Sequence, residues 1–193
     1  MRAWIIAAVL AASGAAYAEP VNYTLDGAHT QVAFSISRFG FNHVLGRFDD
    51  VSGTMVIDEA NPANSSVRAT IQVASVDSGN DTRDEHLRAE RWLNAAAMPT
   101  IEFRSTAVRL TGEHTAEVTG DLTLLGQTHP VTLNVTLNNI GGTPNAPQRR
   151  VAGFSATGSL TRSTWGSTGA QGPNMIGDAV SIQIEALAVP AAN

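Results

Sequence analysis

The stretch VTGDLTLLGQTHPVTLNVTL, residues 118–137, decides the fold class. In its two halves, 118–124 and 131–137, apolar and polar side chains alternate with a period of two. Such alternation, rich in Val, Leu and Thr, is typical of a β-strand with one buried face. The segment Gly126-Gln127-Thr128 lies between the halves and predicts a tight turn. We therefore expect an antiparallel β-hairpin here.

The same alternation recurs on both sides of this hairpin. It predicts further strands at residues 32–36, 48–57, 67–73, 101–105, 151–161 and 180–189. Gly53 predicts a bend or bulge within the second of these. Together with the hairpin this makes about eight strands. The stretches 138–148 and 166–178 are rich in turn-forming residues and are predicted to be long loops.

One helix interrupts the strands. Thr82 and Glu85 have the spacing of a capping box, in which the two side chains satisfy backbone N–H groups at a helix start. An apolar stripe follows at helical spacing from Ala89 to Ala96, and Pro99 ends the pattern. The sequence therefore predicts one short helix between two strands of an all-β domain.

The number of strands raises the question of how the sheet edges are protected. Closure into a barrel removes them, and an eight-stranded barrel has room inside for side chains or one small ligand. A β-sandwich would show the same alternation. Periodicity alone therefore leaves barrel and sandwich both open.

The N-terminal segment MRAWIIAAVLAASGAAYAEP has the pattern of an export signal. Arg2 supplies positive charge, and the apolar run 4–12 is too short to span a bilayer. Ala16-Tyr17-Ala18 places small residues before a cleavage site. We predict a signal peptide over residues 1–18, a mature domain over 19–193 and a periplasmic location. An uncleaved membrane anchor is the alternative.

Charge and composition exclude several functions. The chain has 12 basic residues, all of them Arg, and 17 acidic ones; loss of Arg2 leaves 11 against 17, a net charge of −6. A negative protein is poorly suited to nucleic acid. Without Lys or Cys, the chain can form no Schiff base, disulfide or thiolate metal site. The five histidines lack metal-binding spacing, so we expect no metal site and no cofactor besides a possible bound lipid.

Several segments carry a family resemblance. They are RDEHL at 83–87, WL at 92–93, MPTIEF at 98–103, GDLTLLG at 120–126 and HPV at 129–131. In this order they resemble the YceI-like family of polyisoprenoid-binding periplasmic proteins, and the match covers essentially the whole mature chain. Trp165 departs from the family pattern, in which Phe or another apolar residue is expected before Gly166.

The resemblance implies an elongated eight-stranded antiparallel β-barrel, lipocalin-like in shape, with one short helix. Its pore would hold a long-chain isoprenoid lipid or a ubiquinone-type quinone, which the protein binds and carries in the periplasm. Transient membrane contact and a homodimer are compatible with the resemblance. The identity of the lipid and of its head group stays open.

Candidate lipid-binding residues are apolar side chains expected to face inward. They are Phe34, Ile36, Phe41, Val44, Phe48, Ile71, Phe103, Leu122, Leu124, Leu133 and Val135. Such residues either fill a core or contact a ligand, and each buried methylene of a lipid tail would contribute about 0.8 kcal/mol. Trp165, in a predicted Gly-rich loop, is a candidate for contact with lipid or membrane. Arg162 is the candidate for binding the head group.

Two features allow more than one interpretation. Residues 39–45, between two predicted strands, form either a buried corner or a flap at the pore mouth. Asp84 and His86 could form an acid–base pair, but the helix start already explains the acid, and no nucleophile motif accompanies them. We therefore predict no catalytic residues. A barrel with a filled core and no ligand is the main alternative function, and a hydrolase or isomerase is the less favoured one.

Overall fold

The computed structural model describes residues 19–170, 172 and 175–192. The predicted signal peptide lies outside the described residues. The strands are β1 (Val21–Leu25), β2 (Gln31–Arg38), β3 (Asn42–Phe48), β4 (Val51–Ile57), β5 (Ser66–Gln72), β6 (Val76–Asp77), β7 (Thr100–Leu110), β8 (Thr115–Leu124), β9 (Gln127–Thr143), β10 (Ala146–Thr161) and β11 (Ile176–Pro190). The helix α1 spans Asp81–Arg88, and short 3-10 turns include η1 (Gly27–His29) and η4 (Arg162–Trp165).

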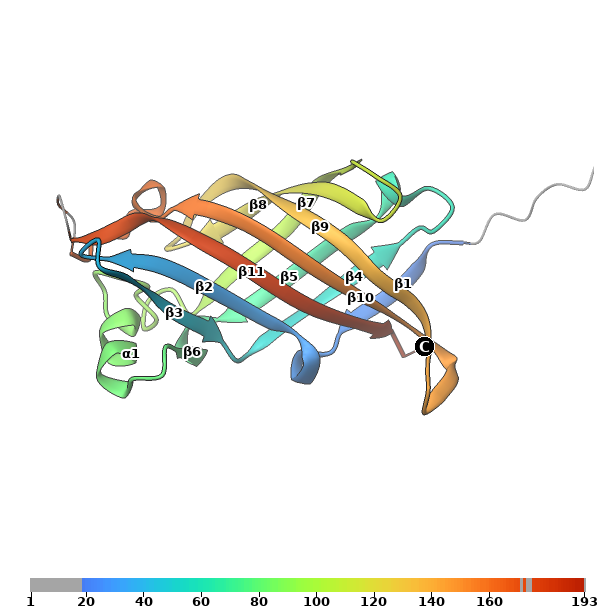
Figure 1. The fold of residues 1–193 in the computed structure, drawn as a ribbon, viewed down its shortest axis with the longest axis horizontal. Helices are drawn as coiled ribbons and strands as arrows, with labels where there is room; N and C mark the ends of the chain where they lie inside the picture. Colours follow the sequence, from blue (N-terminus) through green and yellow to red (C-terminus); the bar gives the residue numbers. More distant parts are fainter. Residues whose placement is uncertain (1–18, 171, 173–174, 193) are drawn as a thin grey trace, which may run out of the picture.

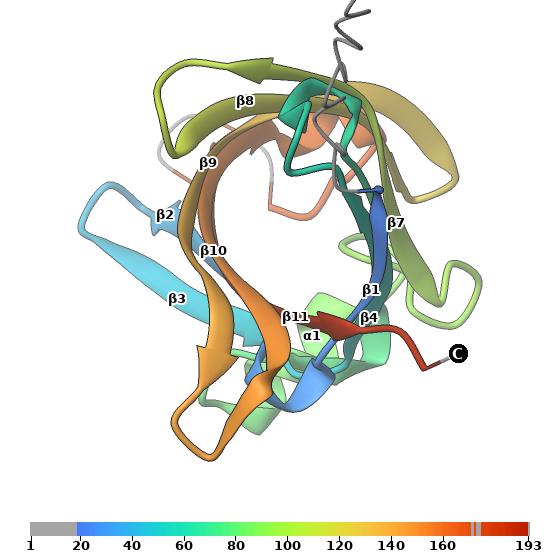
Figure 2. The ribbon, with the colours of Figure 1, turned by 90° about the vertical axis from the view of Figure 1, so that its right-hand side faces the viewer.

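Eight of the strands form a closed antiparallel ring. Their order is β1-β4-β5-β7-β8-β9-β10-β11, and β11 pairs back to β1. The molecule is elongated along the barrel axis (Figure 1), and the ring is seen end-on in Figure 2. The barrel alternative is therefore confirmed over the sandwich, because the β1–β11 ladder leaves no free edge in the ring.

The remaining strands leave the ring at one end. β2 continues the direction of β1 and pairs with β11, then β3 pairs with β2, and β6 covers only the last two residues of β3. The β2–β3 hairpin stands away from the ring of strands (Figure 2). The strand predicted at 48–57 is found as β4, but it begins later than predicted, because Phe48 ends β3 and the chain turns at Asp49-Asp50.

The hairpin predicted from residues 118–137 is confirmed, but the predicted turn at Gly126-Gln127-Thr128 is wrong, because Gln127 and Thr128 already belong to β9. β8 pairs with β9 from Leu124↔Gln127 to Thr115↔Thr136. Leu125 and Gly126 form the two-residue turn, with φ of 53° and 73°. Two left-handed residues in succession match the twist of the flanking strands.

The loop predicted at 138–148 is wrong. β9 continues to Thr143 and β10 begins at Ala146, so the two strands extend past the ring as a long hairpin. The turn-forming residues are accommodated by a register shift between Ala146 and Arg150, which marks an irregularity in the ladder.

The helix is shorter than predicted. Its N-cap is Asn80, whose side chain accepts a hydrogen bond from the Arg83 N–H at 3.0 Å, so the capping box at Thr82 is wrong. The helix ends at Arg88, and turns follow up to residue 98. Asn94 has a φ of 50°, which no α-helix contains. The apolar stripe therefore packs as a series of turns, and Leu93 contacts the core.

Two apolar clusters lie at opposite ends of the barrel. The larger one includes Phe48, Leu124 and Trp165 near α1, and the smaller one includes Tyr23, Ala152 and Ala188. Within the described part of the chain, every buried side-chain nitrogen and oxygen has a hydrogen-bond partner. None of the helices in that part is long and apolar enough to cross a membrane.

Candidate functional site: an apolar cavity along the barrel

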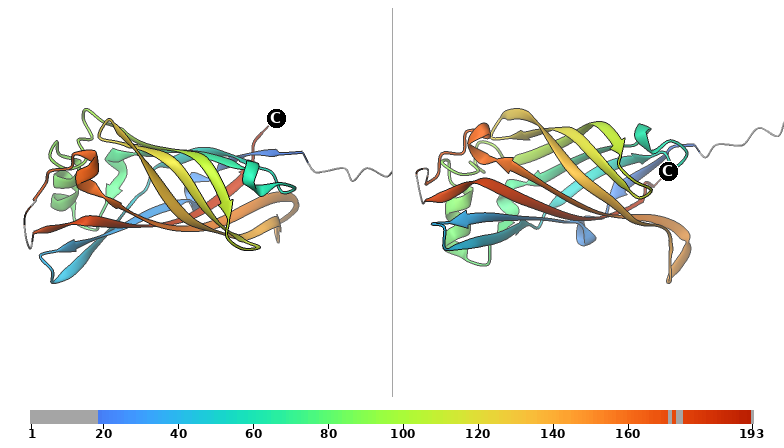
Figure 3. Two further views of the ribbon diagram at one scale, coloured as in Figure 1. Left: turned by 90° about the horizontal axis from the view of Figure 1, so that it is seen from above. Right: turned by 45° about the horizontal axis from the view of Figure 1, so that its top comes forward.

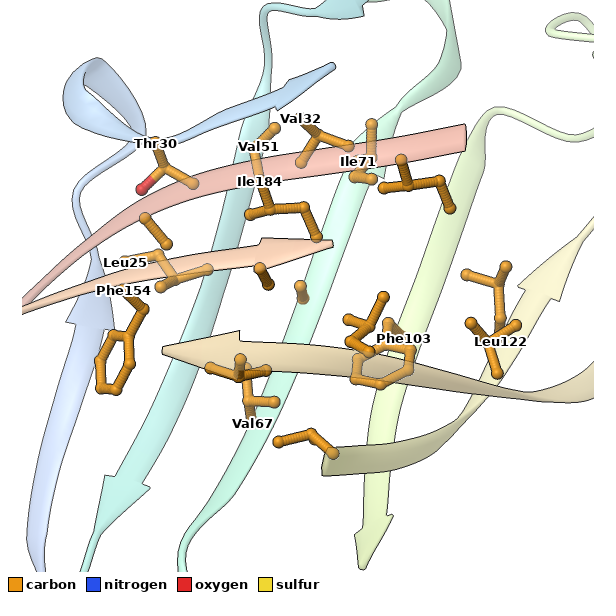
Figure 4. A pocket seen from close by; sticks show the side chains of 18 of the residues that line it. Leu25, Thr30, Val32, Val51, Val67, Ile71, Phe103, Leu122, Phe154 and Ile184 are labelled. Carbon is orange, nitrogen blue, oxygen red and sulfur yellow. The ribbon is translucent and has the colours of Figure 1, made fainter. Parts of the chain in front are cut away.

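A cavity of about 600 Å³ runs through the interior between the two clusters. All eight ring strands contribute to its wall, together with β2. Figure 4 shows the side chains of Val51, Ile71, Phe103, Leu122 and Ile184 from different strands pointing into it. The wall is apolar because alternate residues of each strand face inward, and those residues are mainly Val, Leu, Ile and Phe.

Two inward-facing phenylalanines lie against glycines. Phe34 on β2 is paired with Gly46 on β3, and a Cβ built on Gly46 would lie 2.3 Å from Phe34 Cζ. A Cβ built on Gly120 would likewise lie 2.4 Å from Phe103 Cζ. Each phenyl ring thus fills the space that a side chain at the neighbouring glycine would need. This arrangement keeps the rings close to the wall and leaves the centre of the barrel open.

Arg162 lies at the α1 end of the cavity and is only 5% exposed. Its guanidinium donates to three backbone carbonyls: Nε to Gly177 at 2.9 Å, Nη1 to Ser167 at 3.2 Å and Nη2 to Ile176 at 3.3 Å. It also lies 5.2 Å from the centre of the Trp92 ring. Among the described residues, no carboxylate forms an ion pair with it, so its charge is balanced mainly by carbonyl dipoles.

Burial lowers the pKa of Arg162, and the nearby Asp178 opposes this effect. The Asp178 carboxylate itself accepts two hydrogen bonds from Ser163, from the backbone N–H at 2.9 Å and from the hydroxyl at 2.6 Å. Arg162 also borders a second space of about 530 Å³, which we call the outer hollow and which is lined by Ser37, Gly40, Arg162, Ser163, Gly172, Met175, Ile176, Gly177 and Asp178. A buried cation therefore separates the apolar cavity from a more polar space.

The opposite end of the cavity is acidic. Asp58, Glu59 and Glu113 contribute to its wall there, with His114. Asp58 is buried and accepts from the Asn61 N–H at 2.8 Å, so it closes the β4–β5 connection, whereas Glu113 and His114 are exposed. Glu59 is paired with Arg150 at 2.5 Å, so the unbalanced carboxylates at this end are those of Asp58 and Glu113, opposite the buried cation at the other end.

The structure brings most of the predicted lipid-binding residues together. Nine of them contribute to the cavity wall: Phe34, Ile36, Phe48, Ile71, Phe103, Leu122, Leu124, Leu133 and Val135. Phe41 and Val44 are not part of it. Phe41 is 92% exposed at the turn between β2 and β3, and Val44 is half-buried on β3. The expectation that these two line the pore is wrong, because Phe41 lies in an exposed turn and Val44 lies on the end of β3 that stands away from the ring, whereas Phe48 at the other end of β3 lines the cavity.

Trp165 is also placed differently from the expectation. It is 3% exposed, its Nε1 donates to the Leu122 carbonyl at 3.1 Å, and its ring meets the His129 ring edge-on. The short η4 helix turns it into the core. The predicted position in a Gly-rich loop is therefore wrong, and the burial of Trp165 outside the cavity wall argues against contact with lipid or membrane.

The helix residues considered for acid–base chemistry have a structural role. Asp84 is buried and accepts from the Ser78 N–H at 2.9 Å and hydroxyl at 2.5 Å. Arg83 Nε donates to the same hydroxyl at 2.7 Å, so Ser78 links the two charges in place of a direct pair. His86 is exposed. In the described ranges, no three His, Cys, Asp or Glu side chains are placed to hold a metal ion.

Some wall residues were missed by the sequence analysis. Val180, Ile182, Ile184 and Ala186 on β11, and Phe154 on β10, line the cavity. The period-two pattern in 180–189 contained this signal, since the four β11 residues share one face. Trp92 was harder to find, because its position follows from irregular turns.

Comparison with known proteins supports one family. The model of the YceI-like domain matches residues 23–188. Protein YceI of Escherichia coli O6:H1 is 40% identical over 154 residues, which cover 80% of this chain and 79% of that protein. The crystal structure of Burkholderia cenocepacia BcnA superposes with a TM-score of 0.74 at 25% identity, covering 84% of this chain and 98% of BcnA.

A third similarity shows the fold alone. A domain of Saccharophagus degradans superposes with a TM-score of 0.61 at 17% identity, covering 89% of this chain and 99% of that domain. The closed barrel, its cavity and the matched residues 23–188 together show that this chain belongs to the YceI-like family.

Proposed function

We propose that this protein binds a long-chain isoprenoid lipid in the barrel cavity. The observation that carries the proposal is the apolar wall of a cavity of about 600 Å³. Ligand sites are typically about 300–1,000 Å³ with a few placed polar groups. The Saccharophagus domain, which shares the fold, is described as polyisoprenoid-binding, and this supports the choice of ligand class.

The shape of the cavity suits a tail better than a compact ligand. Its wall extends from Arg162 at one end to Glu113 at the other, along strands such as the 16-residue β10. A tail lying along the axis gains about 0.8 kcal/mol for each methylene removed from water. Several isoprene units would therefore bind through apolar contact, without a polar partner in the middle of the barrel.

The head group would lie beside Arg162. The Arg162 guanidinium carries five N–H groups and a positive charge, so it can donate to a phosphate or a quinone carbonyl in addition to the three backbone carbonyls. At the other end, an anionic head group would meet the carboxylates of Asp58 and Glu113 and be repelled, since the charge of Glu59 is paired with Arg150. This polarity supports a single orientation of the ligand, with its head toward α1.

We further propose that the protein acts as a carrier in the periplasm. The support is the signal-like pattern of residues 1–18 together with the closed barrel, which shields a tail from water. A binding role is favoured over catalysis because the described cavity wall is apolar between its two ends. It is favoured over a filled-core module because the interior is hollow.

The test is native purification of residues 19–193, organic extraction and mass spectrometry. We expect a stoichiometric isoprenoid lipid or quinone, and its mass identifies the head group. Ala156→Phe, which places a ring in the cavity, should abolish the recovered lipid, while Ala107→Phe adds the same ring to an exposed position of β7 and should not. A lipid-free protein that also takes up no added isoprenoid would contradict the proposal.

A further inference from the structure

The turn between β2 and β3 is the most apolar exposed part of the described surface. Phe41 is 92% exposed and Leu45 is 68% exposed, and Met175 is exposed beside them. The Phe39 N–H donates to the Met175 carbonyl at 2.8 Å, so the two loops are joined. We call residues 38–45 and Met175 the apolar tip.

The backbone holds the apolar tip in a defined shape. Phe39 and Gly40 both have left-handed backbone conformations, with φ of 54° and 72°. A left-handed conformation is uncommon for a bulky residue, and such residues persist where the surrounding structure stabilises them. The Arg38 guanidinium lies 4.3 Å from the centre of the Phe39 ring. The Phe41 side chain is therefore presented to solvent by an ordered turn.

The charge of the apolar tip differs from that of the whole protein. Residues 36–46 and 175–177 contain Arg38 and His43 but no acidic residue. The neighbouring Asp178 has its carboxylate engaged by Ser163. In a protein with a net charge of −6 after loss of the leader, the apolar tip thus carries Arg38 and no carboxylate. An anionic bilayer complements both properties, since basic residues approach its surface and apolar ones enter it.

The position of the apolar tip connects it to the cavity. The β2–β3 hairpin lies at the α1 end of the barrel, opposite the C-terminus (Figures 1 and 3). Ser37, Gly40 and Met175 line the outer hollow, and Arg162 is shared by the outer hollow and the cavity. A lipid leaving a bilayer at the tip would therefore meet Arg162 first and the apolar wall behind it.

A second copy of the chain is a weaker explanation of the surface. Three side chains of at most about 250 Å² each, two of them only partly exposed, offer less than the roughly 800 Å² per partner of a stable interface. We propose that the apolar tip docks on anionic lipid membranes and that lipid exchange occurs at this end of the barrel. The exchange rests on the proposed function, whereas the docking does not.

Vesicle binding tests the docking. The probe is vesicles of phosphatidylethanolamine and phosphatidylglycerol, with phosphatidylcholine vesicles as the neutral comparison. We expect the wild type to co-float with the anionic vesicles and Phe41→Ser with Leu45→Ser to lower the partition coefficient by about tenfold or more. Arg38→Gln should weaken binding mainly at low salt. Val21→Ser, which removes an exposed apolar residue from β1, is the matched control and should bind like the wild type.

Two results would overturn the inference. One is equal vesicle binding, or equal lack of it, by the wild type and the double variant. The other is a wild type that self-associates in sedimentation equilibrium through the tip and ignores vesicles, which would make the tip a subunit interface.

Isoprenoid loading separates this inference from the proposed function. Loading from detergent should be unchanged in the double variant, whereas uptake from vesicles should be slower. If the wild type takes up no isoprenoid from detergent, the proposed function fails whatever the vesicles show. If it loads from detergent but never binds vesicles, only the docking inference fails.

Discussion

Phe34 and Gly46 form a directly opposed pair on β2 and β3, and the phenyl ring fills the space that a side chain at Gly46 would need. The glycine is therefore required by the ring and not by its own backbone angles. Because β3 leaves the barrel beyond this point, the pair lies where the ring of strands and the β2–β3 hairpin meet. It links the shape of the cavity to the position of the apolar tip.

Gly46→Ala tests this pair. The new methyl group would clash with the ring and push it toward the cavity, which should cost about 1–3 kcal/mol of unfolding free energy. Gly153→Ala on β10 is the control, because nothing lies within 4 Å of its Cβ. Urea denaturation measures both variants. Equal midpoints for the two would show that Phe34 moves without cost.

Trp165→Phe tests the role of the buried indole. The variant keeps most of the packing and loses the hydrogen bond from Nε1 to the Leu122 carbonyl, so it should lower the unfolding free energy by about 1 kcal/mol. Anionic vesicles should leave the fluorescence of Trp165 unchanged, since Trp165 is in the core. A vesicle-dependent blue shift that disappears in Trp165→Phe would contradict this placement.

Asp84→Asn tests the network around Ser78. The change weakens an acceptor of two hydrogen bonds in a buried position, and we expect a loss of about 1–3 kcal/mol. Glu85→Gln removes the same charge from the next residue, which is exposed, and should change stability little. Thermal unfolding measures the stability of both variants. A similarly small loss of stability in both would contradict a structural role for Asp84.

Asp178 should make part of the stability dependent on pH. Hydrogen bonds from Ser163 hold the pKa of its carboxyl below the ordinary value of 3.8. Because the pKa of Asp178 is lower in the folded state than in the unfolded state, the charged carboxylate stabilises the fold at a pH above the unfolded pKa. This contribution is lost as the pH falls through the folded pKa. Asp178→Asn should therefore lose less stability than the wild type between pH 5 and about pH 3.

The partner of Asp178 provides the check on this pH dependence. Ser163→Ala removes the hydroxyl but keeps the backbone N–H, so it should flatten the acid dependence only in part. Denaturant midpoints at several pH values measure all three proteins. Parallel curves for wild type and Asp178→Asn would exclude a contribution from this carboxylate.

Arg162→Lys and Arg162→Met separate charge from geometry at the end of the cavity. Lys keeps the positive charge but cannot reach the carbonyls of Ser167, Ile176 and Gly177 together. For an anionic isoprenoid we expect affinity to fall in the order wild type, Lys, Met. The affinity for a neutral isoprenoid alcohol should differ little among the three proteins. Circular dichroism checks that each variant is folded. An unchanged affinity for the anionic lipid in Arg162→Met would place the head group elsewhere.

Local patterns predicted most of the inward-facing residues correctly. A period of two in Phe34 and Ile36, or in Leu122 and Leu124, states which face of a strand is apolar, and nine of the eleven inward-facing candidates line the cavity. The hairpin was predictable because its two strands alternate, but its turn was placed too late, at 126–128, since a leucine such as Leu125 gives no local sign of a left-handed conformation. The helix boundaries were less accurate, since Asn80 outcompetes Thr82 as the cap.

What the sequence by itself determined is therefore the all-β class, the apolar faces and the family. The tertiary structure decided the closure of β1 on β11, the continuation of β9 and β10 through 138–148, the burial of Trp165 and the exposure of Phe41. These features depend on contacts between residues far apart in the chain. Alternation specifies a face but not the partner strand. Phe41 is exposed because it lies in the turn between β2 and β3, and Val44 misses the cavity because that end of β3 stands away from the ring.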